Sequence, residues 1–212
     1  MTVTAIEELS KTRSKIFLDG TFAFVLYKGE LRKYQIKEGG ELSQESFDEL
    51  WEVILPKRAK LRAMNLLKSR QYTEKQLLDK LLLGGYNREI AQIAVDYVKS
   101  YHYVDDAQYA YDYITGRMER HSIKEIEQKL MQKGIAKELI CKAIEQHAEL
   151  GQLPDERKMI LKILEKKDCI GRKLEEKEKR RLYGYFYRKG FSQETLRQVL
   201  RENQQDEWDS FT

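Results

Sequence analysis

The sequence predicts a mainly α-helical protein, in which three tandem three-helix repeats follow a small β-rich N-terminal module. The first observation behind this prediction is a pattern written three times: a helical stretch ends at a glycine, and a second amphipathic helix begins at once. The glycines are Gly85, Gly134 and Gly190, offset by 49 and 56 residues. The second observation is strand-like alternation around Asp19-Gly20. A repeat of helix pairs favours a binding surface over a catalytic pocket.

Apolar residues stand at the same places in each copy of the repeat. Before the glycine, two of them are four residues apart and so share one helix face. After it, an aromatic or aliphatic residue can fold back onto the helix that has ended. We expect each glycine to adopt the left-handed conformation past a helix end, which a side-chain branch disfavours. The matching sets are Leu77, Ile126 and Leu182; Leu81, Leu130 and Phe186; Tyr86, Ile135 and Phe191; Ala91, Ile140 and Leu196; Ala94, Ala143 and Val199; Val95, Ile144 and Leu200.

Helix-start signals support the same repeats. Thr73 with Gln76, and Ser122 with Glu125, match the capping box. Asn87 and Ser192 suit the cap positions of the second helices in copies one and three. A further helix is expected before each pair, near 57–69, 105–120 and 155–167. Thr195 departs from the pattern, because the other copies carry Ile90 and Leu139 at that place.

Two prolines, Pro56 and Pro154, stand near the expected boundaries between units. The predicted organisation is an N-terminal β-hairpin module with a following helix at 1–55, repeat 1 at 56–101, repeat 2 at 102–153, repeat 3 at 154–204 and an acidic tail at 205–212.

The first 42 residues differ from the rest of the chain. Alternation around Asp19-Gly20 predicts a β-hairpin, and Val3 to Leu9 could add a third strand. A short helix near 28–34 and a turn at Gly39-Gly40 follow. Ser43 then caps a helix that is expected to run to about Leu55.

Positive charge is unevenly placed although the net charge is only +4. Residues 57–70 hold 6 Lys and Arg and no acid, and residues 155–201 hold 15 against 8 Asp and Glu. The middle unit, 102–150, holds 7 against 9. Basic ends suit an elongated body that contacts a polyanion or an acidic protein groove, although solvated helix faces also carry many cations. The candidate contact residues are Arg58, Arg62, Lys68, Arg70, Arg117, Lys133, Lys179, Arg180, Arg181, Arg188 and Lys189.

No motif carries a reaction. The chain has no Gly-rich phosphate loop and no His-Glu-x-x-His sequence, and N-capping explains Asp105-Asp106 better than catalysis does. Cys141 and Cys169 lack the spacing of a metal or redox site. We therefore expect a protein that is not an enzyme and has no catalytic residues, no cofactor and no metal.

A run of tyrosines between 97 and 113 leaves two interpretations open. The rings could stack on nucleic-acid bases, but Tyr109 and Tyr113 are four residues apart, which favours packing between helices. No apolar stretch approaches a membrane span and no signal peptide is visible, so a reducing cytoplasm is the expected setting.

The chain resembles the RecX family of bacterial recombination regulators. The matching stretches are YTEKQLLDKLLLGGY, YHYVDDAQYAYDYITGR, EQKLMQKGI and RRLYGYFYRKGF, which lie within residues 57–201. The N-terminal extension is similar to that of the longer members found in Gram-positive bacteria. One departure is Gly84, where the other copies have Lys133 and Lys189.

The resemblance implies a curved, elongated molecule that binds the RecA recombinase and its filament on single-stranded DNA. It also implies inhibition of strand exchange, ATP hydrolysis and SOS co-protease activity. We expect the protein to act as a monomer, to contact single-stranded DNA weakly and directly, and to have no membrane partner. The alternative is a direct DNA-binding protein, such as a helix-turn-helix transcription factor, although the second helices near 87–98 and 136–147 are not strongly basic.

Overall fold

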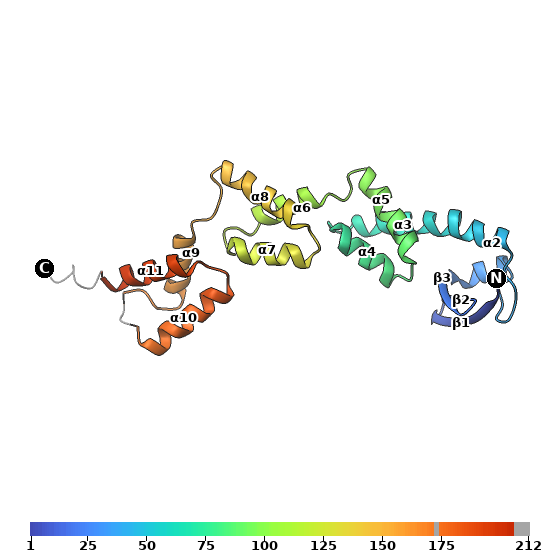
Figure 1. Ribbon diagram of the computed structural model, residues 1–212, viewed down its shortest axis with the longest axis horizontal. Helices are drawn as coiled ribbons and strands as arrows, with labels where there is room; N and C mark the ends of the chain where they lie inside the picture. The colour runs from blue at the N-terminus through green and yellow to red at the C-terminus, as the bar shows by residue number, and fades with distance from the viewer. Residues whose placement is uncertain (172–173, 206–212) are drawn as a thin grey trace. The chain divides into compact units, whose positions relative to one another are not determined.

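The computed structural model describes the backbone of residues 1–171 and 174–205 and, within them, the side chains up to residue 203. The chain divides into two compact units, Met1–Asp105 and Asp106–Thr212 (Figure 1). The first unit holds the N-terminal module and repeat 1, and the second holds repeats 2 and 3. Beyond Gln205, the predicted acidic tail lies outside the described residues and stays a prediction.

The N-terminal module is built on an antiparallel sheet with strand order β1-β2-β3. The strands are β1 (Val3–Ser10), β2 (Arg13–Leu18) and β3 (Thr21–Tyr27). Asp19 and Gly20 join β2 to β3 with φ angles of 47° and 81°. Two successive positive φ angles match the right-handed twist of paired strands. The predicted hairpin and its third strand are therefore confirmed.

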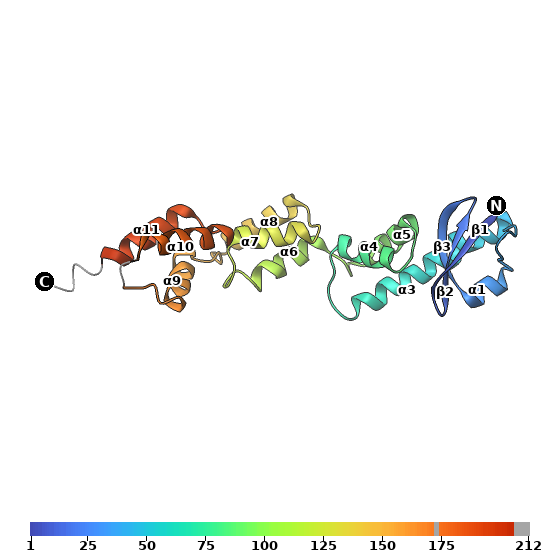
Figure 2. The same cartoon turned by 90° about the horizontal axis from the view of Figure 1, so that it is seen from below.

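A continuous helical stretch connects the module to repeat 1, after the short helix α1 (Lys28–Lys33). Ser43 caps this stretch as expected, because its side chain accepts from the Ser46 N–H. The stretch consists of α2 (Gln44–Asp48), the π-helical turn η1 (Glu49–Ile54) and α3 (Leu55–Leu67). It therefore runs through the boundary expected at 55/56. Pro56 lacks an N–H and cannot donate a helical hydrogen bond, and it lies in the first turn of α3, directly after the π-helical turn. Figure 2 shows α3 extending from the sheet to α4 and α5.

The remaining helices complete the three predicted repeats. Repeat 1 adds α4 (Glu74–Leu83) and α5 (Arg88–Ser100) to α3. Repeat 2 contains α6 (Asp106–Thr115), α7 (Ile123–Gln132) and α8 (Lys137–Glu149). Repeat 3 contains α9 (Glu156–Lys166), α10 (Glu176–Arg188) and α11 (Gln193–Gln205).

All three glycine turns have the expected conformation. The φ angles of Gly85, Gly134 and Gly190 are 92°, 90° and 78°. The next residue in each case donates its N–H to a carbonyl five residues earlier, which satisfies a group that the helix end leaves open. The pairs are Tyr86 to Leu81, Ile135 to Leu130 and Phe191 to Phe186.

Each helical repeat has an apolar core at the predicted places. Leu81, Leu130 and Phe186 are fully buried. In the first unit, the sheet and repeat 1 share one cluster of buried residues that runs from Val3 to Val104. Repeats 2 and 3 each have a separate cluster in the second unit. Repeat 1 therefore depends on the N-terminal module for its packing.

Two of the glycine turns also approach a neighbouring element closely. A Cβ atom added to Gly85 would lie 2.6 Å from Cγ2 of Val25 on β3. One added to Gly190 would lie 2.8 Å from Oγ of Ser122, the cap of α7. Glycine is thus required at both places by the backbone angle and by the space available.

Candidate interaction surface

The candidate cations lie in different surroundings, and Arg58 has a structural role. Its guanidinium donates to both carboxylate oxygens of Glu30, at 3.0 and 2.7 Å, and to the carbonyl of Val25. It also lies over the rings of Tyr27 and Tyr86. The side chains of Arg58 and Glu30 are only 20% and 21% exposed. We therefore correct the interpretation of Arg58, which joins α3 to the N-terminal module and leaves its charge unavailable to a partner.

The other candidate cations of the first unit are exposed. Arg62 lies on α3, Lys68 is the residue that ends it, and Arg70 follows in the next turn. The guanidinium of Arg70 lies 4.4 Å from the centre of the Tyr72 ring. Cation–π contacts of this kind hold the guanidinium near the ring without neutralising its charge.

In repeat 2, Arg117 and Lys133 lie beside two stacked tyrosines. The rings of Tyr109 and Tyr113 on α6 are 6.1 Å apart and nearly parallel. The Arg117 guanidinium lies 3.9 Å from the Tyr113 ring centre, and the Lys133 ammonium lies 5.4 Å from it. This arrangement supports the packing interpretation for these two tyrosines.

The end of α5 presents the other tyrosines differently. Tyr101 and Tyr103 are 58% and 63% exposed, and their rings stack 6.1 Å apart. Tyr97 lies 5.1 Å from Tyr101, and the Lys60 ammonium lies over its ring. Helix packing therefore does not account for Tyr101 and Tyr103, and the base-stacking interpretation stays open for them.

Arg180, Arg181 and Arg188 of α10 border one open surface hollow of about 370 Å³. Lys167, just after α9, lines the same hollow, and its ammonium lies 4.4 Å from the centre of the Tyr185 ring. We call these five residues the α10 arginine surface. Its three arginines are exposed, and none forms an ion pair with a side chain in the described part of the chain. The surface therefore keeps an excess of positive charge for a partner.

Sequence reasoning found the arginines of this surface but not Lys167 or Tyr185. Lys167 lies in the sequence among acids such as Glu165 and Asp168, so its local pattern is that of a solvated helix end. Only the fold brings it beside α10. Lys179 is less free than expected, because its ammonium lies 3.2 Å from a carboxylate oxygen of Glu176.

Lys189 belongs to a junction between repeats 2 and 3. Its ammonium lies 3.4 Å from Oε1 of Glu125, which Lys129 and His121 also contact, at 2.8 and 3.0 Å. Ser122 accepts from the Glu125 N–H and donates to the Lys189 carbonyl at 2.6 Å. We call these five residues the Glu125 junction.

The surroundings of Glu125 act on its pKa in opposite directions. Burial raises it, but Lys129, His121 and Lys189 outweigh burial and lower the pKa from 4.5 to about 2. Oε2 of Glu125 is buried, with no hydrogen-bond partner among the described residues. Because Glu125 faces these cations, its side chain does not return to Ser122 to complete the predicted capping box. Thr73 and Gln76, by contrast, form theirs.

Residues 1–171 and 174–205 were compared with the requirements of a metal site and of a membrane-spanning helix. No group of three or more His, Cys, Asp or Glu side chains there could hold a metal ion. No helix in that part is long and apolar enough to cross a bilayer. His147 is a core residue, because it is fully buried, stacks on Tyr111 and contacts Gln152.

The three repeats match known sequence families. The model described as RecX, first three-helix domain, matches residues 59–97. Those of the second and third three-helix domains match residues 105–144 and 155–200. The matched ranges follow the three repeats in order.

Curated proteins and solved structures give the same result. The chain is 33% identical over 202 residues to a protein named Regulatory protein RecX from Caldanaerobacter subterraneus subsp. tengcongensis. The match covers 94% of this chain and 98% of that protein. It is 28% identical to a protein of the same name from Clostridium beijerinckii, with 95% of this chain and 94% of that one covered.

Two crystal structures share the fold. One is described as the regulatory protein RecX, with a TM-score of 0.61, 23% identity and coverage of 93% of this chain and 98% of that one. The other is RecX from Lactobacillus salivarius, with a TM-score of 0.57, 18% identity and coverage of 71% and 97%.

Fold and surface together define a class: tandem three-helix repeat proteins with an N-terminal sheet and exposed basic patches. The chain belongs to the RecX family, whose curated members are named regulatory proteins. A regulatory role follows from that membership.

Proposed function

We propose that this protein binds the RecA recombinase and its filament on single-stranded DNA, and restrains strand exchange, ATP hydrolysis and SOS co-protease activity. The observation that carries the proposal is the match of all three RecX domains, in order, to the three repeats. A body of tandem repeats offers extended contact to a filament, which presents a groove along its length.

The α10 arginine surface supports a role in contacting the filament or its DNA. Its arginines lack acidic partners in the described structure, and guanidinium groups pair with phosphates and carboxylates through two parallel hydrogen bonds. Arg62, Lys68, Arg70, Arg117 and Lys133 remain secondary candidates, and direct binding to single-stranded DNA is part of the proposal.

The proposed action is not enzymatic. It needs no catalytic group, cofactor or metal, since a bound regulator can change the stability of a filament through differential affinity alone. We place this action in the cytoplasm, with the protein acting as a monomer, and light scattering of the free protein tests the latter.

The test is binding of the protein to RecA filaments preassembled on single-stranded DNA. Arg180→Glu with Arg181→Glu should weaken binding strongly, because it reverses two exposed charges on the proposed surface. Lys137→Glu with Lys142→Glu is the matched control, since both lysines are exposed on α8 and the change in net charge is the same. Equal weakening by both pairs would remove the case for the α10 arginine surface.

Binding measurements on the same protein also distinguish the RecA proposal from the transcription-factor alternative. A helix-turn-helix protein reads base edges in duplex DNA with one helix, so its binding should depend on sequence and should not require RecA. Binding that is stronger to one duplex sequence than to RecA filaments would favour that alternative.

A further inference from the structure

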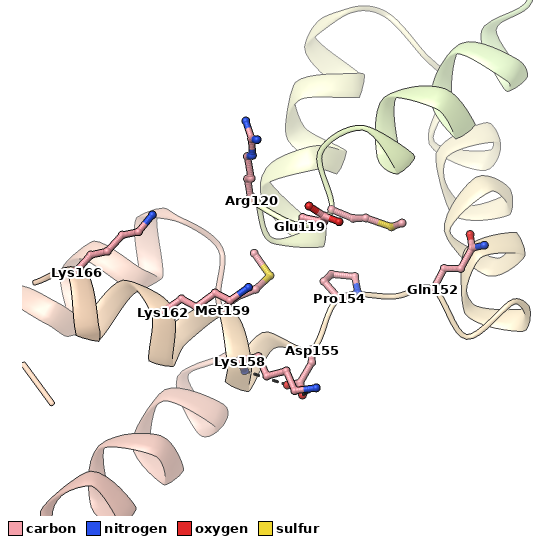
Figure 3. A pocket seen from close by; sticks show the side chains of 10 residues that line it. Glu119, Arg120, Gln152, Pro154, Asp155, Lys158, Met159, Lys162 and Lys166 are labelled. Carbon is pink, nitrogen blue, oxygen red and sulfur yellow. Dashed lines mark hydrogen bonds and ion pairs between the residues drawn. The ribbon is translucent and has the colours of Figure 1, made fainter. Parts of the chain in front are cut away.

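A second basic hollow, of about 520 Å³, lies on the second unit between residues of repeats 2 and 3. Figure 3 shows α9 on one side of it and the segment that carries Glu119 and Arg120 on the other. We call it the α9 lysine hollow and define it by Met118, Arg120, Lys158, Met159, Lys162 and Lys166. None of its cations was singled out by the sequence.

The cations of the hollow follow a regular order. Lys158, Lys162 and Lys166 are four residues apart on α9, so they share one face of the helix. A rise of 1.5 Å per residue separates neighbouring lysines by about 6 Å along the axis. In Figure 3, Arg120 extends from the opposite side of the hollow. The result is a row of positive charges on α9, with a further cation on the segment across the hollow.

Few of these charges are neutralised within the described chain. Arg120, Lys162 and Lys166 are exposed and form no ion pair with the described side chains. Lys158 lies 3.9 Å from Asp155, which also caps α9 by accepting from the Lys158 N–H. Glu119 is the other acid that lines the hollow. The cations therefore outnumber the acids, and an anionic partner would find them exposed.

We propose that the α9 lysine hollow binds the phosphate backbone of a nucleic-acid strand. The proposal adds a second strand-contacting site, separate from the α10 arginine surface. It rests on the proposed function for its biological setting. A row of similar cations suits a partner with one negative charge in each repeating unit. The lining holds no aromatic ring for base stacking, so binding should be independent of sequence.

An acidic peptide is the competing occupant, and the lining disfavours it. Peptides usually gain affinity by placing an apolar or aromatic side chain in a pocket. Met159, one of two methionines that line the hollow, is only 7% exposed, and no aromatic side chain lines it. Phosphate contacts need only charge, which the hollow supplies.

The experiment measures binding of the full chain to an end-labelled oligothymidylate, without RecA, over a range of salt concentrations. Each phosphate contact on a single strand contributes about 0.7 to the slope of log affinity against log salt. Lys162→Gln with Lys166→Gln should therefore weaken binding and lower the slope by about 1.4. The matched control is Lys137→Gln with Lys142→Gln on α8, which removes the same charge elsewhere in the second unit. Circular dichroism of both variants verifies folding.

Two results would overturn the proposal. One is the same affinity and slope for the α9 and α8 variants. The other is binding of poly-glutamate that depends on Lys162 and Lys166 while oligothymidylate binding does not, which would assign the hollow to an acidic peptide. Because RecA is absent, failure here is separate from failure of the RecA proposal: loss of filament binding with intact strand binding would count against RecA alone.

Discussion

At the scale of single residues, Gly190 combines two requirements that can be separated by experiment. It has a positive φ, and an added Cβ would also lie 2.9 Å from Cβ of Lys124. Gly151 has a positive φ of 64° but open space around it. Gly151→Ala should cost about 1 kcal/mol from backbone strain alone. Gly190→Ala should cost about 1–3 kcal/mol more, because a neighbouring element must move.

Denaturant unfolding measures both glycine variants, and hydrogen exchange should localise the loss to α7 and α10 for Gly190→Ala. Equal costs for the two variants would show that the close approach to α7 is not maintained in solution.

Glu125 gives a pH-dependent prediction at the same scale. Its pKa is about 2 in the folded protein and 4.5 ordinarily. A carboxylate with a lowered folded pKa adds stability that is complete above its unfolded pKa and is lost as the pH falls through the folded one. Glu125→Gln should therefore destabilise the protein at neutral pH, by roughly 1–3 kcal/mol. The difference in unfolding free energy between Glu125→Gln and the unmodified protein should shrink as the pH falls from 4.5 to about 2.

The control for Glu125 is Glu145→Gln, an exposed residue on α8. Its unfolding should match the unmodified protein at every pH. A constant difference between Glu125→Gln and the unmodified protein down to pH 2 would mean that the cations around Glu125 do not hold it ionised.

At the scale of elements, α4 carries a matched pair of leucines. Leu81 is fully buried and Leu83 is 82% exposed. Leu81→Ala should lower the free energy of unfolding by about 2–5 kcal/mol, because it leaves a cavity in the core. Leu83→Ala should change it by less than about 0.5 kcal/mol. Leu130→Ala should repeat the Leu81 result in the second unit. Thermal unfolding that does not distinguish Leu81 from Leu83 would show that the repeat register is wrong.

Local patterns predicted the elements well, whereas contacts distant in the sequence were not predictable. The glycine turns and the Thr73 cap depend on residues within one turn of each other. Glu30, the partner of Arg58, lies 28 residues earlier, so a run of cations at 57–70 gave no sign that Arg58 is neutralised. Lys189 and Glu125 are likewise 64 residues apart.

The candidate surfaces also depend on contacts between residues that are distant in the sequence. The arginines of α10 were found because each stands next to another cation in the sequence, in Lys179-Arg180-Arg181 and in Arg188-Lys189. The α9 lysine hollow was not predicted, because its lysines alternate along α9 with apolar core residues and Arg120 belongs to another repeat. A search for cations at helical spacing would have found Lys158, Lys162 and Lys166, but not Arg120, which lines the same hollow from another repeat.

At the scale of the whole molecule, the central proposal is that the protein restrains RecA on single-stranded DNA. The most direct measurement is RecA ATPase activity and strand exchange at fixed DNA, with this protein titrated from trace amounts to equimolar. We predict inhibition well below one copy per RecA, because a body of three repeats should affect several filament subunits. The Arg180→Glu, Arg181→Glu variant should need much more protein for the same effect, and the Lys137→Glu, Lys142→Glu control should not. No change in either activity at equimolar protein would contradict the claim, as would inhibition that additional DNA fully reverses.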